Sequence, residues 1–524
     1  MGGRVPLAVG AVAAATALII GIVFGTYVAG GSDSSCYLNA GRLLARGAVR
    51  LEQPLVRDAP WANAERTFTP AGFTPSRADP AFFVPICSPG LPLAMALFRV
   101  LRLNEFLVVP LLGALGVWLT YVIGCRVHSP ATGAAAALLV VCSPTFLYQV
   151  VQPMSDVPAM AWWLLAIAWV IEREDGSNRP WLAGLATSLA LLTRPNLVLL
   201  SIGLAAYLLA TAGPGRRVRA VARFGAGLAP GLLMLAMLQR GMYGSPLSTG
   251  YGDVEGMMAA SHVVPNLIRY AGWLGGTHGP FLLLALAAPA VVARRRHAWL
   301  CLGISAATLA SYLPYLVFDA WWYTRFLLPA IPLLILLSVT TLVALIERLV
   351  ARAPVALAVC TAVVMAAWVN VARERRAFEV ASLEQHFYRA GMAVATYLPE
   401  AGAIVTAKAS GSVQYHAGVA IVSWDTLDPG SLDQALAYLR RGDSPVYLLL
   451  EGEEEPAFRD RFSRTSLVGH LDWPPLVQVG RTIRIYDPLD RARYLADGTV
   501  RTRFVQEAPV PFRDWRRWLR SSGG

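Results

Sequence analysis

The stretch that organises this chain joins a long apolar run, Val5–Ala29 (VPLAVGAVAAATALIIGIVFGTYVA), to the polar segment Gly31–Gly47 (GSDSSCYLNAGRLLARG). A bilayer-spanning helix needs about 20 apolar residues, so the first run is long enough to cross. It is too long for the apolar core of a cleaved signal peptide and therefore predicts a signal anchor. The second segment places the carboxylate of Asp33 just outside the membrane, either as a solvated helix cap or as a functional group.

Composition divides the chain into two parts. Of the 524 residues, 56% are hydrophobic and only 15% are charged, whereas about a quarter of the residues in a soluble domain are charged. Half of the charged residues follow residue 372. We therefore predict a membrane domain over residues 1–372, an exported soluble domain over residues 373–503 and a basic tail rich in Trp and Arg over residues 504–524.

Apolar runs predict a polytopic α-helical membrane protein with about eleven transmembrane helices. The predicted spans are 5–29, 106–126, 131–150, 157–171, 180–194, 196–212, 223–240, 279–293, 298–317, 327–346 and 354–372. One more run, residues 86–103, has prolines near its start and arginines near its end. That pattern favours a helix that lies at the membrane interface or re-enters it, without crossing.

The distribution of arginine predicts the orientation. Three basic loops, at residues 216–223, 294–296 and 348–352, are all cytoplasmic only if residues 86–103 do not cross the membrane. The N-terminus is then cytoplasmic in a multi-pass protein of the cell (inner) membrane, and residues 31–84 form an external loop. The C-terminal domain is then periplasmic or external. The net charge of +12 collects in short loops, so it indicates topology and not nucleic-acid binding.

The six cysteines are too few for a disulfide framework, and they lack the C-x-x-C spacing typical of metal sites. Two of them, Cys36 and Cys87, fall in or beside the predicted external loop. They can pair if that loop faces an oxidising compartment, or remain free thiols.

The soluble part alternates between helical and strand patterns. Helices are expected near 383–398, 412–416, 432–440 and 456–462, with strands at 403–406, 419–423, 446–450 and 482–486. This alternation predicts a small α/β domain with a mainly parallel sheet. The domain has no G-x-G-x-x-G, P-loop or G-x-S-x-G motif, so no motif in it indicates chemistry.

Several polar residues interrupt the apolar runs at their predicted external ends. Asp156 is either the N-cap of the following helix or a functional carboxylate. Arg194 can snorkel to the interface or hold a phosphate. Tyr323 and Arg325 belong either to an aromatic belt or to a site. His278, in a predicted external loop, is a weaker candidate. Together, two carboxylates and two arginines on one face suit a general base acting beside a bound leaving phosphate.

The order of four short motifs resembles the C-type (GT-C) integral-membrane glycosyltransferases, in particular bacterial relatives of protein mannosyltransferases and lipid A aminoarabinose transferases. The likeness covers roughly residues 5–345. The motifs are Ser32-Asp-Ser-Ser-Cys-Tyr37, Ser88-Pro-Gly-Leu-Pro92, Pro153-Met-Ser-Asp156 and Tyr323-Thr-Arg-Phe-Leu-Leu-Pro-Ala-Ile-Pro332.

This resemblance implies inverting transfer of a sugar from a polyprenyl-phosphate donor to a lipid, glycan or protein acceptor on the external face. It implies that Asp33 activates the acceptor and that Asp156 is a second acid of the site. The chain departs from the pattern in two places. Many relatives have a second acid where Ser34 stands, and the Lys or His of some proline motifs is absent.

Because those residues are absent, the donor phosphate would have to contact Arg77, Arg194 or Arg325, with Tyr323 and His278 as further donor-site candidates. No metal ligands are assigned, and dependence on a divalent cation stays open. Two other functions also stay open. A transporter or flippase of lipid-linked sugars would place charges near the bilayer midplane and show internal repeats, whereas here the charges lie at helix ends. A non-catalytic membrane scaffold could use the exported domain to bind a partner.

Overall fold

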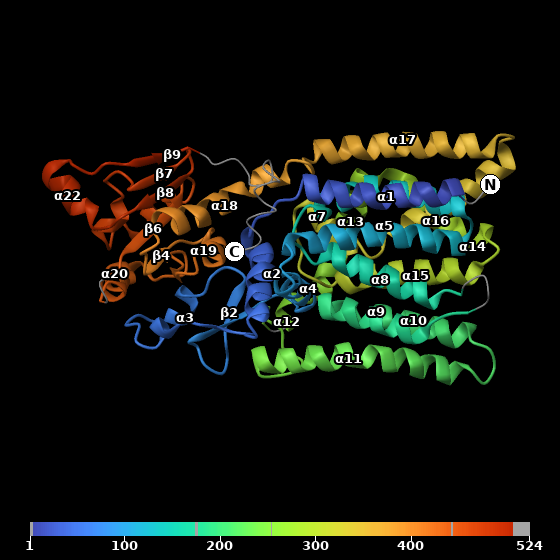
Figure 1. Cartoon of the computed structure of the whole chain (residues 1–524), viewed down its shortest axis with the longest axis horizontal. Coiled ribbons are helices and arrows are strands. Elements are labelled where there is room, and N and C mark those ends of the chain that lie inside the picture. Colours follow the sequence, from blue (N-terminus) through green and yellow to red (C-terminus); the bar gives the residue numbers. More distant parts are fainter. Residues whose placement is uncertain (1–3, 173–176, 253, 442–443, 507–524) are drawn as a thin grey trace.

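The computed structural model describes residues 4–172, 177–252, 254–441 and 444–506. It consists of a long helical bundle and, at one end of it, a smaller α/β body (Figure 1). Most of the predicted tail, from residue 507 onward, lies outside the described residues.

Six stretches of the described chain are long and apolar enough to cross a membrane. These are α1 (Arg4–Val23), η2 with α5 (Glu105–Val127), α11 (Arg217–Tyr243), η4 with α13, η5 and α14 (Ala260–Val291), α16 (Ile331–Leu349) and α17 (Ala353–Glu374). The pair α6 (Pro130–Cys142) and α7 (Pro144–Val150), bent by 62°, is a seventh if it forms one span.

Shorter helices complete the bundle. They are α8 (Asp156–Val170), α9 (Pro180–Thr193), α10 (Val198–Thr211) and α15 (Arg295–Tyr312), which run alongside the long helices in Figure 1. Glycines allow the tightest packing: a Cβ at Gly184 of α9 would meet the Gly227 Cα of α11 at 2.9 Å. Because length and composition support six or seven spans, the predicted count of eleven is not confirmed.

One predicted boundary is wrong. The sequence suggested a span at 279–293 that follows an external loop, but the structure has a helical stretch from Ala260 to Val291. α13 (Val263–His278) was missed because its apolar residues alternate with Asn266, Arg269 and several glycines, which lowers its hydropathy. His278 therefore lies inside a candidate span and not in a loop.

The run at 86–103 forms α4 (Gly90–Val100), whose 11 residues reach only about 16 Å at 1.5 Å per residue. This is half of the thickness of a hydrocarbon core, so α4 is too short to span. Its exposed side chains Leu97, Val100 and Leu101 are apolar. These features agree with the predicted interfacial helix.

The two ends of the bundle differ in charge. The N-terminus and the basic turns between α10 and α11 and between α16 and α17 lie at one end (Figure 1). The α/β body lies at the other end, together with α2 (Gly31–Ala45), which follows α1. The predicted separation of basic loops from Asp33 is therefore present in the fold.

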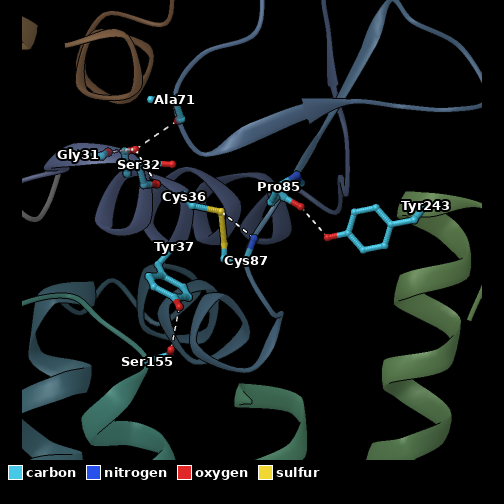
Figure 2. Close-up of a disulfide and its surroundings, with 10 residues drawn as sticks. Gly31, Ser32, Cys36, Tyr37, Ala71, Pro85, Cys87, Ser155 and Tyr243 are labelled. Carbon is cyan, nitrogen blue, oxygen red and sulfur yellow. Dashed lines mark hydrogen bonds between the residues drawn. A yellow bond between two sulfur atoms is a disulfide. The ribbon is translucent and has the colours of Figure 1, made fainter. Parts of the chain in front are cut away.

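Residues 31–84, hereafter the external segment because the sequence predicts them to be external, fold around α2. The strands β1 (Leu51–Glu52), β2 (Phe73–Pro75) and β3 (Phe82–Pro85) form an antiparallel sheet in the order β1-β3-β2, with the short α3 (Ala64–Thr67) before β2. A disulfide joins Cys36 of α2 to Cys87, just after β3 (Figure 2). Of the two alternatives that the sequence left open for these cysteines, the structure has the disulfide.

The C-terminal body contains the predicted helices as α18 (Val380–Tyr397), α19 (Ser410–His416), α20 (Leu432–Leu439) and α21 (Glu455–Phe462), and adds α22 (Asp490–Asp497). Its strands are β4 (Ala403–Val405), β5 (Ala420–Val422), β6 (Val446–Glu451), β7 (Val477–Val479), β8 (Ile483–Tyr486) and β9 (Arg503–Val505), in the order β5-β4-β6-β8-β7-β9. Only β8 runs antiparallel to its neighbours, β6 and β7, and the other five strands share one direction. The sheet is therefore mainly parallel, as predicted, with one antiparallel strand.

The external segment and the C-terminal body share one hydrophobic core. Trp61, Phe68 and Phe83 of the external segment pack in the same cluster as Val405 and Leu448 of the sheet. The two segments that the sequence assigned to different domains are therefore one folded unit on the end of the bundle.

Candidate active site

Asp33 lies in the first turn of α2 and is paired with an arginine. Its Oδ2 lies 2.8 Å from Nη2 of Arg325, in η6 (Trp321–Leu327). A carboxylate near a helix N-terminus is favoured by the helix dipole. The Asp33 side chain is 36% exposed, whereas that of Arg325 is 13% exposed. Asp33 is thus held by a charge and still open on one side.

Asp156 is the first residue of α8, and its side chain is fully buried. Its Oδ1 accepts a hydrogen bond from Nη2 of Arg194 at 2.6 Å. Arg194 follows α9 and also donates to the hydroxyls of Ser155, at 3.2 Å, and Tyr312, at 2.7 Å. A buried carboxylate is tolerated because it is paired and hydrogen-bonded in this way.

Tyr37 connects the two ion pairs. It follows Asp33 by four residues and therefore lies on the same face of α2. Its hydroxyl donates to Ser155 Oγ at 2.7 Å (Figure 2). Ser155 is the residue that Arg194 also contacts. The pairs Asp33–Arg325 and Asp156–Arg194 thus belong to one polar cluster between α2, α8, α9 and η6.

Phe326 lies against both guanidinium groups. Its ring centre is 5.3 Å from Cζ of Arg194 and 5.3 Å from Cζ of Arg325. The ring also stacks on Tyr312 at 4.9 Å. Cation–π contacts of this kind hold the two arginines in place, so their unused donors have fixed directions.

The charges of the cluster stabilise one another. Burial acts to lower the pKa of Arg325, but the carboxylates of Asp156 and Asp33 outweigh it and raise the pKa above its ordinary value. The pKa of Arg194 is also raised, because Asp156 outweighs the effect of burial. Burial raises the pKa of Tyr37 to about 12, so its hydroxyl stays protonated at neutral pH.

Two buried polar atoms of the cluster have no hydrogen-bond partner within the described residues. They are Oδ2 of Asp156 and Nε of Arg325. Leaving a buried polar atom unpaired costs about 1–3 kcal/mol. The Asp156 oxygen can therefore accept a hydrogen bond from a bound group, and the Arg325 nitrogen can donate one to it.

The structure places the remaining predicted residues differently. Tyr323 belongs to the cluster: its ring stacks on Phe318 at 3.9 Å and lies 5.2 Å from Cζ of Arg325. His278 is buried in the bundle, where its two ring nitrogens lie 2.8 Å from the hydroxyls of Ser143 and Thr277. These contacts satisfy both nitrogens and favour a structural role for His278.

Arg77 is exposed in the turn between β2 and β3. The start of this hairpin lies against α2, because Gly72 packs on the backbone of Cys36. The turn is at the opposite end of the hairpin, so the structure does not bring Arg77 into the cluster that contains Asp33.

The cluster also contains residues that the sequence did not single out, namely Ser155, Tyr312 and Phe326. Ser155 precedes Asp156, which is a weak signal. Phe326 directly follows Arg325 in η6 and stands in the fourth motif, at residues 323–332. Tyr312 ends α15, and no pattern in the sequence pairs it with Arg194.

Within the described residues, no three His, Cys, Asp or Glu side chains come together in a group that could hold a metal ion. Asp33 and Asp156 are each paired with an arginine. The residues present therefore do not form a metal site made by the protein alone.

Comparison with known proteins identifies the fold. A family model described as dolichyl-phosphate-mannose-protein mannosyltransferase matches residues 90–238, from α4 to α11. The structure is similar to ArnT from Cupriavidus metallidurans bound to undecaprenyl phosphate, at a TM-score of 0.54 over 86% of this chain and 94% of that chain. The chain has the GT-C fold.

Other GT-C structures also match. The Archaeoglobus fulgidus oligosaccharyltransferase in complex with Zn and sulfate gives a TM-score of 0.55 over 91% of this chain and 73% of that chain. The identities are low, 14% for ArnT and 13% for the oligosaccharyltransferase, so these matches establish the fold. No curated protein matches the chain by sequence.

Within the GT-C fold, the family match covers Asp156 and Arg194 but neither Asp33 nor Arg325. The Asp156–Arg194 pair therefore lies inside the matched region and the Asp33–Arg325 pair outside it. The hydrogen bond from Tyr37 of α2 to Ser155 joins the two.

Proposed function

We propose that the protein transfers a sugar from a polyprenyl-phosphate-linked donor to a lipid, glycan or protein acceptor on the external or periplasmic face of the inner membrane. The observation that carries this proposal is the pairing of Asp33 with Arg325 and of Asp156 with Arg194 in one cluster at the end of the bundle. The GT-C fold supports it, because the two solved relatives are a protein bound to undecaprenyl phosphate and an oligosaccharyltransferase.

Asp33 is the acceptor-activating base in this proposal. It is the more exposed of the two carboxylates, so an acceptor hydroxyl or amide can approach it. As the acceptor attacks the anomeric carbon, its proton passes to Asp33. The bond from that carbon to the phosphate oxygen breaks, and the polyprenyl phosphate leaves with the bonding electrons.

The arginines hold the leaving phosphate. Charge builds on the phosphate oxygen as the bond breaks, and guanidinium donors at that position stabilise the transition state. The unpaired Nε of Arg325 supplies a donor that no described side chain uses. Asp156, buried against Arg194, holds that arginine in position, and Tyr323 borders the same space.

The proposal is tested by reconstituting the purified protein in liposomes with undecaprenyl phosphate linked to a radiolabelled sugar. We expect label to move from the lipid to an added acceptor extract. A protein that moves intact labelled lipid between leaflets, without breaking its sugar–phosphate bond, would be a transporter and would contradict the proposal.

Dependence on a divalent cation is a second part of the proposal. The Archaeoglobus oligosaccharyltransferase in complex with Zn and sulfate supports it, whereas the described residues of this chain contain no ligand cluster that would. Treatment with EDTA, followed by addition of Zn²⁺, Mn²⁺ or Mg²⁺, tests it directly. Loss of transfer in EDTA that one of these cations restores would support a cation shared with the donor phosphate. Full transfer in EDTA would contradict this part.

A further inference from the structure

α2 presents two different faces to its surroundings. Asp33 and Tyr37, four residues apart, face the polar cluster of the membrane domain. Ser35, Asn39 and Arg42 have spacings of four and three residues and therefore share the other side of the helix. That second side contacts α19 of the C-terminal body.

The contacts between α2 and α19 are polar and buried. Nδ2 of Asn39, whose side chain is buried, donates to the carbonyl oxygen of Gly411 at 3.0 Å. Arg42 donates to the carbonyl oxygen of Tyr415, and its Cζ lies 4.7 Å from the centre of the Tyr415 ring. Two side chains of α2 therefore bind two successive turns of α19.

A glycine sets the distance between the two helices. A Cβ added at Gly411 would meet Cβ of Ser35 at 2.6 Å and the carbonyl oxygen of Ala71 at 2.9 Å. Neither contact is possible without movement, so only glycine permits this approach. Ser410 bonds the start of α19 to the external segment, because its Oγ accepts a hydrogen bond from the backbone N–H of Ala71 at 3.1 Å.

α19 also reaches the interfacial helix. The Tyr415 hydroxyl donates to Oε1 of Glu105 at 2.6 Å, and Glu105 is paired with Arg99 of α4. Both Tyr415 and Glu105 are buried. The C-terminal body is thus bonded to α2 and to the start of α5 through one short helix.

A carboxylate of the C-terminal body lies at the edge of its sheet where ligands usually bind. In α/β sheets that place lies beyond the carboxyl ends of adjacent strands whose connections diverge, here β4 and β6. The Glu454 carboxylate fills it and accepts the backbone N–H groups of Lys408 and Glu451 at 3.2 and 3.0 Å. The hydrogen bonds of the body with α2 come from α19.

We propose that the C-terminal body is a positioning element for the reaction: α19, through the contacts of Gly411 and Tyr415 with Asn39 and Arg42 of α2, holds α2 so that Asp33 faces the donor site. This inference rests on the proposed function, since it assigns α2 to the acceptor-activating step. Gly411, Asn39 and Tyr415 are positioning residues and touch no substrate.

The test compares two glycine-to-alanine variants of the full-length protein. Gly411→Ala places a methyl group against Ser35 of α2, whereas Gly402→Ala places one against Ser444 within the C-terminal body. Both substitutions add one methyl group that clashes with a serine side chain, and the two variants differ in where the clash occurs. Hydrogen–deuterium exchange of residues 31–45 and the kinetics of sugar transfer are measured on both variants.

We expect Gly411→Ala to raise exchange in residues 31–45 and to lower kcat about tenfold or more. Binding of undecaprenyl phosphate stays unchanged, because Arg194 and Arg325 are not on α2. Gly402→Ala leaves exchange in residues 31–45 and kcat at wild-type values. In a Ser35→Gly background, which removes the clashing side chain, the effect of Gly411→Ala on both measurements becomes smaller.

Unchanged exchange of α2 in a folded Gly411→Ala protein would overturn the inference, as would unchanged kcat with raised exchange. If Gly411→Ala does not fold, Tyr415→Phe removes only the hydroxyl that bonds Glu105, with Tyr447→Phe as the control inside the C-terminal body. A wild-type protein without transfer activity would refute the proposed function alone, because the exchange measurement still decides whether α19 holds α2.

Discussion

The two acidic residues of the cluster differ in accessibility, and this difference separates their roles. Asp156 is fully buried and has one oxygen on Arg194. Asp33 is the exposed partner of Arg325 and can be approached from outside the bundle. A base must reach the proton of its acceptor, so Asp33 suits that role, whereas Asp156 suits the support of an arginine.

The Asp156–Arg194 pair predicts a large stability effect. Asp156→Asn leaves the buried Arg194 guanidinium without its counter-charge, which typically destabilises a protein by about 3–5 kcal/mol. We expect a lower melting temperature in detergent and reduced transfer. Asp319→Asn is the control, because Asp319 is paired with Arg269 but is 90% exposed. Equal stability of the two variants would contradict the assignment.

Single residues of the site could be named from the sequence, but their pairing could not. Asp33, Asp156, Arg194 and Arg325 each stand out as charges at the ends of apolar runs. Arg325 lies 292 residues from Asp33, and hydropathy contains no information on which ends of helices meet. Hydroxyl and aromatic partners such as Ser155 and Tyr312 resemble ordinary core residues. His278 was misplaced because a predicted loop proved to be helical.

At the scale of elements, α2 is the segment on which the site depends. It is fixed to the segment after β3 by the Cys36–Cys87 disulfide and to Ser155, just before α8, by Tyr37 (Figure 2). Asn39 and Arg42 fix it to α19. Three independent attachments hold one helix of 15 residues. Precise placement of a reacting group can lower the activation free energy of a reaction by several kcal/mol. This is more than a single hydrogen bond of α2 adds to the free energy of unfolding.

The disulfide makes a prediction of its own. It closes a loop of 51 residues, for which the chain-entropy account gives about 4 kcal/mol of stabilisation. We expect Cys36→Ser to lower the melting temperature, and dithiothreitol to lower that of the wild type to a similar value. Cys360→Ser, at a free cysteine, provides the control. Two free thiols at residues 36 and 87, found by mass spectrometry without reduction, would show that the bond does not form.

Hydropathy predicted most of the long helices because a helix that spans a bilayer must be apolar over about 20 residues. It also predicted that α4 lies at the interface, because the apolar run there begins with prolines and is too short to cross. It was less informative for α13, whose polar residues are satisfied inside the fold: Nδ2 of Asn266 donates to the carbonyl oxygen of Tyr315 at 2.6 Å. In the C-terminal body the alternating pattern predicted the helices, the strands and a mainly parallel sheet, but not the antiparallel direction of β8. A sequence does not distinguish a parallel strand from an antiparallel one when both faces are buried.

At the scale of the whole molecule, the site lies where two folded units meet. The membrane bundle supplies Asp156, Arg194 and Arg325, and the external unit supplies Asp33 on α2. The external unit is built from residues on both sides of the bundle sequence, since the segment after α2 shares its core with the C-terminal sheet. Removing the C-terminal body would therefore expose the core of the external segment as well.

The arrangement predicts the topology of the protein. The N-terminus and the basic turns lie at the end of the bundle opposite to the C-terminal body (Figure 1). The positive-inside rule then places that body outside the cytoplasm. We expect alkaline phosphatase fused after residue 374 to be active and green fluorescent protein fused there to be dark. The reverse result would place the site in the cytoplasm.

The overall fold was predictable because the resemblance rests on the order of motifs along the chain, which survives at low identity. The merging of the external segment with the C-terminal body was not predictable, because it depends on contacts such as Trp61 with Tyr438 at 5.6 Å, between residues far apart in the sequence.

The most direct test of the account compares sugar transfer by wild type, Asp33→Asn and Asp79→Asn in liposomes that contain undecaprenyl phosphate linked to a radiolabelled sugar. Asp79 is a carboxylate of the same external segment, paired with Arg57 at 3.2 Å and remote from α2. The account predicts that Asp33→Asn slows transfer by at least about 100-fold with unchanged binding of undecaprenyl phosphate, while Asp79→Asn transfers at the wild-type rate. Transfer by Asp33→Asn at the wild-type rate would contradict the account.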